Sequence, residues 1–179
     1  MKLLYLHGLG SSGQSSTALG LMEAGFDVIS PDYQPQHYQQ SIEPLLLLVD
    51  KEKPTLLVGT SMGGYYVLKL AELTGLPVVA VNACFQPELQ LAKYLEQDAH
   101  DYVTGEAIVF TTTMLASFTP IKLASDTEPT IVIGDNDEII PADEQKQFCK
   151  QQSWSWISTD WGHRVGDKQQ LTQIIRDRY

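Results

Sequence analysis

Six short apolar runs alternate along the chain with longer amphipathic segments, and this alternation constrains the fold more than any other feature. The runs cover residues 2–6, 27–30, 55–58, 78–82, 130–133 and 154–158. Most are rich in Leu, Val and Ile and are bounded by Gly or Pro, as is typical of parallel strands that are buried on both faces. The last run alternates around Trp154 and Trp156, which favours an edge strand.

Most of the intervals between these runs carry the cap residues and amphipathic patterns that are typical of helices. They predict helices over residues 15–24, 41–53, 63–74, 142–151 and 167–177. Strands that alternate with helices form right-handed crossovers, so the chain is predicted to be an α/β protein with a doubly wound, mostly parallel sheet of about six strands. Sites in such sheets lie at the carboxyl ends of the strands.

Residues 85–128 break the alternation, and they are interpreted as a helical cap or lid inserted into a single domain that spans residues 1–179. The insertion begins with a predicted helix over residues 87–97. It carries six large apolar side chains: Phe85, Tyr94, Phe110, Met114, Leu115 and Phe118. These side chains either wall a pocket over the site or pack on the core.

A glycine-flanked serine follows the third apolar run, in the sequence Gly59-Thr60-Ser61-Met62-Gly63. This is the Gly-x-Ser-x-Gly pattern of a nucleophile elbow, a strained strand-to-helix turn that exposes a serine hydroxyl. Because a serine hydroxyl is a weak nucleophile without an adjacent base, the pattern requires partners elsewhere in the chain. The sequence therefore predicts Ser61 as a nucleophile.

The partners of such a serine are a base and a carboxylate that orients the base. His163 is the candidate base, because it follows the last predicted strand and precedes the last helix. His37 and His100 lie in polar segments and are interpreted as surface residues.

The loop from Gly134 to Pro141 supplies the candidate acid, Asp137. Asp135 is interpreted as an Asx-turn residue that shapes this loop, and Asp160 is a second alternative. The resulting order of Ser61, Asp137 and His163 is the chain order of α/β-hydrolases.

An oxyanion hole for such a serine needs two N–H donors. Met62, directly after the nucleophile, is predicted to supply one. The turn His7-Gly8-Leu9-Gly10 after the first strand is predicted to supply the other, from Leu9 or failing that Gly10. His7 is expected to fix this turn through hydrogen bonds, without transferring protons.

Further segments carry a family resemblance. They are Leu4–Gly8 with Ser11-Ser12, Gly59–Tyr66, Val81-Asn82 with Pro87 and Tyr94-Leu95, Tyr102–Gly105, Gly134–Glu138 and Gly162-His163. Together they resemble the small YqiA-like esterase family of α/β-hydrolases nearly end to end, most specifically in the Gly-Gly-Tyr-Tyr that follows Met62 and in the Tyr-x-Thr-Gly of the insertion. Ala83 departs from the proline expected at that position.

The resemblance implies a minimal α/β-hydrolase fold whose esterase or thioesterase activity acts on small-molecule acyl substrates. Two alternatives stay open on the same framework. One is an amidase or peptidase that uses the same three residues. The other is a non-catalytic module that binds a ligand or protein, because a fold does not fix a function.

Composition limits the partners and the location. The net charge of −10 argues against nucleic acid or an anionic membrane. No metal-ligand spacing, dinucleotide fingerprint or phosphate loop occurs, so no metal and no cofactor are expected. Cys84 and Cys149 are interpreted as reduced thiols. With no signal peptide or membrane span expected, the predicted location is the cytoplasm.

Overall fold

The computed structural model describes residues 1–179 and contains a six-stranded sheet in which every neighbouring pair is parallel. The strands are β1 (Lys2–Leu6), β2 (Asp27–Ile29), β3 (Leu56–Thr60), β4 (Val78–Val81), β7 (Thr130–Gly134) and β8 (Trp156–Thr159). Their order across the sheet is β2-β1-β3-β4-β7-β8. The predicted doubly wound α/β sheet and the edge position of the last strand are therefore confirmed.

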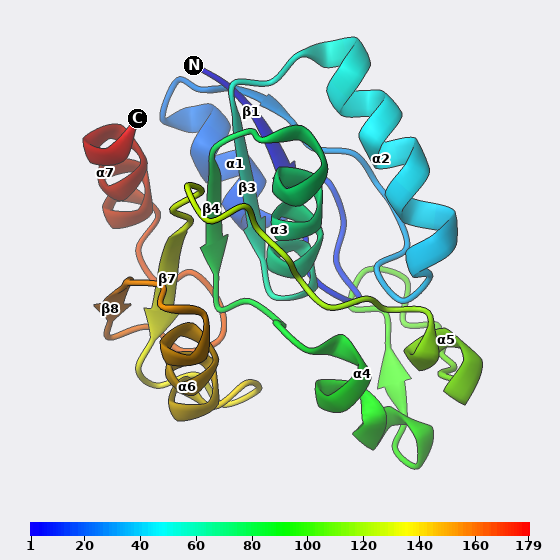
Figure 1. The fold of residues 1–179 in the computed structure, drawn as a ribbon. Helices are drawn as coiled ribbons and strands as arrows, with labels where there is room; N and C mark the ends of the chain where they lie inside the picture. The colour runs from blue at the N-terminus through cyan, green and yellow to red at the C-terminus, as the bar shows by residue number, and fades with distance from the viewer.

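Five helices cover the two faces of this sheet (Figure 1). They are α1 (Ser16–Glu23), α2 (Tyr38–Glu52), α3 (Met62–Thr74), α6 (Ala142–Gln152) and α7 (Lys168–Arg178). Alternate residues of β1 divide between the faces: Leu4 and Leu6 join a large core cluster with α2, α3 and α6, whereas Leu3 joins a smaller cluster with α1 and α7. Burial on both faces explains why the strands read as continuous apolar runs.

The α2 helix begins at Tyr38, three residues before the predicted start at Ser41. The Ser41 hydroxyl does not cap the helix; it lies inside the first turns and donates to the carbonyl of Gln34. Tyr38 is buried among aromatic rings, so tertiary packing extends the helix beyond its local start signal.

The predicted helix over residues 87–97 is wrong. The structure has a single turn, α4 (Pro87–Gln90), followed by the 3-10 turn η1 (Ala92–Leu95). Only Pro87 and Leu91 are buried among those eleven residues, so a longer helix would have no apolar face to pack against the core. The rest of the insertion contains the two-stranded antiparallel hairpin of β5 (Ala99–His100) and β6 (Ala107–Ile108), which was not predicted, and the short α5 (Thr112–Ala116).

The insertion lies beyond the carboxyl ends of the strands, where α4 and α5 appear below the strand arrowheads in Figure 1. Its apolar side chains pack on the core. Phe85, Phe110, Leu115 and Phe118 belong to the large core cluster, and Tyr94 and Met114 pack against it.

Cys84 and Cys149 are both buried and unpaired. No helix in the structure combines the length and the apolar character needed to cross a lipid bilayer.

Candidate active site

Ser61 lies in a tight turn between β3 and α3. Its backbone has φ 55° and ψ −120°, a conformation that costs a non-glycine residue about 1–3 kcal/mol. The turn is held by its neighbour β4, because Ser61 N donates to the carbonyl of Val81 and Ser61 O accepts from the N–H of Cys84, both at 3.0 Å. The strain is therefore balanced by bonds to the adjacent strand.

Glycine is required on both sides of this serine. A Cβ on Gly63 would fall on the carbonyl oxygen of Leu6 in β1, and a Cβ on Gly59 would fall on the carbonyl of Gly63. Gly8 is packed similarly closely, since a Cβ there would lie 3.0 Å from Ser61 Cβ. The first turn of α3 and the loop after β1 can therefore approach the serine closely.

The structure brings Ser61, His163 and Asp137 into one chain of hydrogen bonds. His163 Nε2 lies 3.0 Å from Ser61 Oγ, and His163 Nδ1 lies 2.9 Å from each carboxylate oxygen of Asp137. The Asp137 side chain is fully buried and the His163 side chain is 15% exposed. Because a carboxylate can only accept, Nδ1 carries the proton toward Asp137 and leaves Nε2 free to accept from the serine.

Asp137 is held as a charged carboxylate by several donors. Oδ1 accepts from the N–H groups of Ile139 and Ile140 at 2.9 and 2.8 Å, and Oδ2 accepts from Gln145 Nε2 at 3.0 Å. Burial opposes ionisation, but the hydrogen bonds from His163 and from these N–H groups outweigh it and lower the pKa of Asp137.

The interpretation of Asp135 as the Asx-turn residue is wrong. Its Oδ1 accepts from Lys146 Nζ at 2.7 Å and from the Ser158 hydroxyl at 3.1 Å, away from the loop backbone. Asp137 itself accepts from the backbone two and three residues ahead, so the residue that contacts the imidazole also shapes the loop. Asp160 is not a hydrogen-bond partner of His163.

Free N–H groups lie in the two segments next to the serine. In the loop after β1, the N–H groups of Leu9 and Gly10 donate to no acceptor in the chain. Met62 is the first residue of α3, so its N–H has no intrahelical acceptor and belongs to the positive end of the helix dipole. The fold itself therefore leaves these donors unused.

Gly10 is engaged by the insertion. It has φ 66°, and its carbonyl accepts from the N–H of Tyr102 at 2.8 Å. The Tyr102 ring in turn lies 5.7 Å from the guanidinium of Arg164, the residue after His163. The hairpin of the insertion thus contacts both the loop after β1 and the histidine loop.

His7 is a buried, neutral member of the loop after β1. Burial lowers the pKa of its imidazole. Nδ1 lies 2.9 Å from the carbonyl of Gly8, and the His7 carbonyl accepts from the Tyr33 hydroxyl at 2.7 Å. Nε2 is buried without a partner, and the ring packs 4.7 Å from that of Tyr33. His100 is exposed and His37 is partly exposed, and neither imidazole is hydrogen-bonded to Ser61, Asp137 or His163, although the backbone of His100 lies against Gly10.

Two adjacent tyrosines explain the Gly-Gly-Tyr-Tyr sequence after the elbow. The Tyr65 hydroxyl donates to the carbonyl of Thr119 at 2.8 Å and accepts from its N–H at 3.0 Å, which fixes the exit of the insertion. The Tyr66 hydroxyl donates to the carbonyl of Pro35 at 3.0 Å. Sequence reasoning noted these tyrosines only as part of the resemblance and missed their contacts.

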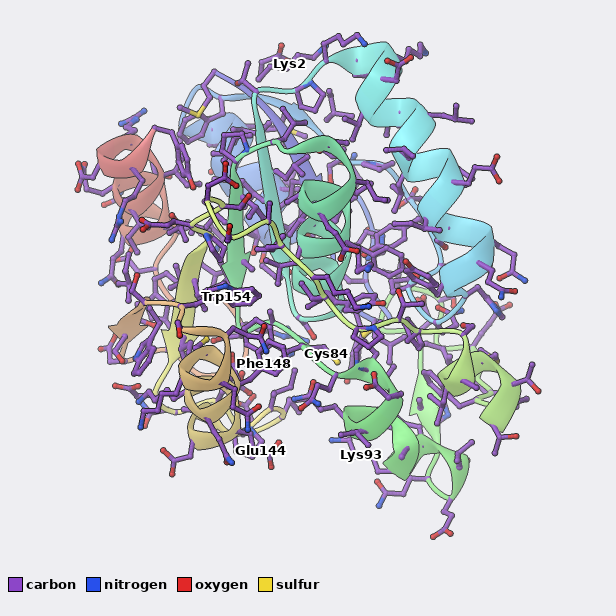
Figure 2. The ribbon with its side chains drawn as sticks, viewed as in Figure 1. Lys2, Cys84, Lys93, Glu144, Phe148 and Trp154 are labelled. Atoms are coloured by element: carbon purple, nitrogen blue, oxygen red, sulfur yellow. The ribbon has the colours of Figure 1, made fainter.

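The entrance of the insertion is fixed by aromatic packing. Phe85 stacks on Phe148 of α6 with ring centroids 4.7 Å apart, and Trp154 packs edgewise on Phe148 at 5.8 Å. Figure 2 shows Phe148 and Trp154 beside α6, close to Cys84 at the start of the insertion. Both ends of the insertion are therefore fastened to the body of the domain.

Sequence reasoning gave no role to Asn82, which follows β4 and is fully buried. Its Nδ2 donates to the carbonyls of Gly162 and His163, each at 2.9 Å, and its Oδ1 accepts from the N–H of Gly134 at 2.7 Å. The available signal was its position, a polar residue at the carboxyl end of a buried strand.

No three side chains of His, Cys, Asp or Glu are arranged to hold a metal ion.

A family model described as "Uncharacterised protein family (UPF0227)" matches residues 2–176. Among solved structures, alpha/beta hydrolase domain-containing protein 10 from mouse is similar with a TM-score of 0.75 at 15% identity, covering 98% of this chain and 88% of that one. An extracellular alpha/beta-hydrolase from a Paenibacillus species has a TM-score of 0.70 at 11% identity, covering 99% and 98%. Polyneuridine aldehyde esterase has a TM-score of 0.74 at 14% identity, covering 98% of each chain.

At these identities the likeness concerns the fold, which is that of the α/β-hydrolases. The family match extends over nearly the whole sequence, and the chain belongs to the uncharacterised protein family UPF0227.

Proposed function

We propose that this protein is a serine hydrolase that cleaves a carboxylic ester or thioester through an acyl-enzyme intermediate. The observation that carries the proposal is the continuous hydrogen-bonded chain from Ser61 through His163 to Asp137. It starts at a serine held in strained elbow geometry and ends at a buried carboxylate, as nucleophilic catalysis by serine requires.

In the first half-reaction, His163 Nε2 takes the proton of the Ser61 hydroxyl while Oγ attacks the acyl carbon. The imidazolium that forms is stabilised by the Asp137 carboxylate, which stays ionised. His163 then gives its proton to the leaving alcohol or thiol, and the acyl group remains on Ser61 Oγ. In the second half-reaction, water replaces the alcohol, and the acid is released with Ser61 restored.

The oxyanion of each tetrahedral intermediate would be bound by the N–H groups of Leu9 and Met62. Support for this assignment comes from their lack of other acceptors and from the close packing of Gly8 on Ser61. Gly10 stays the alternative donor to Leu9, because only its carbonyl is bound, by the N–H of Tyr102, and its own N–H has no acceptor. Removing one such donor typically lowers turnover about a hundredfold or more.

The substrate is proposed to be a small-molecule acyl ester or thioester. Residues 85–128 serve as a fixed cap, because the Tyr102 N–H donates to the carbonyl of Gly10 in the loop after β1 and because Phe85 and Thr119 are anchored to the body of the domain. An esterase, polyneuridine aldehyde esterase, shares this fold. No metal or cofactor takes part in the proposed steps.

Labelling with a fluorophosphonate tests the nucleophile. We expect one adduct by intact mass on the unchanged protein and none on Ser61→Ala, with the adduct mapped to the peptide that contains Ser61. A folded protein that takes up no adduct and hydrolyses no ester would contradict the proposal. That result would favour the alternative of a non-catalytic module, in which ligand binding survives Ser61→Ala.

A substrate panel then separates esters from amides. We expect turnover of p-nitrophenyl esters and acyl thioesters of graded chain length and none of matched anilides or peptides. Preferential cleavage of the anilides would move the assignment to an amidase that uses the same three residues.

A further inference from the structure

The three residues proposed to act together come from three different loops, after β3, β7 and β8. The bonds that join the acid loop to the histidine loop include those from Asp135 N to the carbonyl of Thr159 at 2.8 Å and from Asn136 N to the carbonyl of Trp161 at 3.0 Å. These bonds do not reach the segment around Ser61, to which both loops are connected through the strand pairing of the sheet. A side-chain contact from the strand beside Ser61 to both loops would fix their position more closely than the strand pairing alone.

Asn82 makes that contact through its side chain. Its amide bridges Gly134, where the acid loop begins, and the carbonyls of Gly162 and His163. The orientation of the amide is dictated by its partners, since the N–H of Gly134 can only donate and the two carbonyls can only accept. Both the oxygen and the nitrogen of the Asn82 side-chain amide are thus hydrogen-bonded to these loops.

The backbone around Asn82 is fastened to the nucleophile. Val81 O accepts from Ser61 N, and Cys84 N donates to Ser61 O, so the four-residue segment that contains Asn82 holds Ser61 on both sides. Asn82 itself has φ 46°, a strained value for a residue with a side chain, and it is fully buried. Such strain persists only where the surroundings hold it, here with three side-chain bonds.

We propose that Asn82 is a positioning residue that sets the register of His163 and Asp137 against Ser61. The inference rests on the proposed function, and it adds a fourth residue to the three on which that function depends. A shift of the histidine loop by about 1 Å would lengthen the contact between Nε2 and Ser61 Oγ, and misplacement on that scale costs about a hundredfold in rate.

The primary variant is Asn82→Gly, which accepts the positive φ and removes the whole side chain with its amide. Lys53→Gly is the matched control, because Lys53 also has a positive φ, 50°, but lies at the end of α2 outside the site. For Asn82→Gly we expect fluorophosphonate labelling of Ser61 to slow by about 10- to 100-fold, with kcat lowered and KM nearly unchanged. Lys53→Gly should match the unchanged protein.

A spectroscopic readout separates positioning from stability. The proton that His163 Nδ1 shares with Asp137 should give a far-downfield proton NMR signal in the unchanged protein and in Lys53→Gly. In Asn82→Gly we expect this signal to broaden or disappear while the rest of the spectrum stays folded. A merely structural role would lower Tm and leave both the signal and the labelling rate of the folded protein unchanged, and that result would overturn the inference.

Asn82→Asp is the second variant, in case the glycine variant does not fold. It has the same shape and can still accept from Gly134, but its carboxylate faces the carbonyls of Gly162 and His163, so slowed labelling is expected again. Labelling of folded Asn82→Asp at the rate of the unchanged protein would overturn the inference.

These outcomes are distinguishable from failure of the proposed function. If Ser61 of the unchanged protein takes up no label, the proposed function fails first. If it labels rapidly and Asn82→Gly labels at the same rate with the same NMR signal, only the role of Asn82 is refuted.

Discussion

His163 Nε2 lies 3.0 Å from Ser61 Oγ although 102 positions separate the two residues in the sequence. The contact forms because β3 and β8 are parallel strands of one sheet, so the loops that follow them emerge at the same edge. No local signal in the sequence joins the two residues, because the sheet is what brings their loops to one edge.

Replacing His163 with alanine should abolish turnover and leave the fold intact. The side chain is partly exposed and contacts Ser61 and Asp137 at the edge of the sheet, so its removal deletes the base without opening the core. We expect kcat for an ester to fall on the order of a millionfold. His37→Ala is the control, because the side chain of His37 makes no capping bond at the start of α2. Comparable losses in both variants, measured with Tm, would refute the role of His163.

Asp137→Asn should weaken the dependence of stability on acid pH. The pKa of Asp137 in the folded protein is lowered from its ordinary value of 3.8, so the charged carboxylate stabilises the fold above that pH. This contribution is lost as pH falls through the lowered folded value. Urea unfolding from about pH 7 down to pH 3 should therefore show the gap between the unchanged protein and Asp137→Asn narrowing below about pH 4. A gap that stays constant across this range would contradict the expectation.

Gly63→Ala should destabilise the protein by about 1–3 kcal/mol, because the added Cβ falls on the carbonyl oxygen of Leu6 in a rigid strand. Gly20→Ala in α1 is the matched helical control. Its Cβ would meet only the flexible side chain of Lys168, so the higher helix propensity of alanine should leave stability equal or slightly greater. Free energies of unfolding from urea titration make the comparison, and equal effects at the two glycines would show that the elbow is not tightly packed.

Tyr65→Phe should loosen the exit of the insertion, whereas Tyr66→Phe should not. The first change leaves the N–H and the carbonyl of Thr119 without their partner, at a cost of about 1–3 kcal/mol, and the second affects only Pro35. Hydrogen exchange of the backbone over residues 112–122 should speed up in Tyr65→Phe alone. Faster exchange of this segment in both variants, or in neither, would argue against a specific anchor at Tyr65.

The sheet was predictable because its strands are buried on both faces, which leaves uninterrupted apolar runs such as that of β4. The Gly-x-Ser-x-Gly pattern was equally informative, since Gly63 packs so closely on the backbone of Leu6 that no other residue fits there. The start of α2 was misplaced because Tyr38 joins the helix through tertiary packing, which overrides the local signal at Ser41.

Parts of the site depended on contacts that no sequence pattern records. Asp137, and not Asp135, accepts the Asx-turn bonds, because the carboxylate of Asp135 instead accepts from Lys146 of α6. The insertion was the least predictable segment, since its short elements are held by Gly10 and Tyr65, which lie outside residues 85–128. The contacts of Asn82 could not be predicted for the same reason, because its three partners become neighbours only when β7 and β8 join the sheet.

The anchoring of the insertion at both ends has a consequence for how this protein can diversify. Phe85 is stacked on α6 and the backbone of Thr119 is bonded to Tyr65 of α3, so both ends of the segment are fixed while exposed residues such as Tyr102 and Val103 lie between them. The exposed positions between these anchors can therefore vary in sequence while Ser61, His163 and Asp137 keep their places. Any replacement must keep two features of the segment, the buried core side chains of Leu91, Phe110 and Leu115 and an N–H donor for the carbonyl of Gly10.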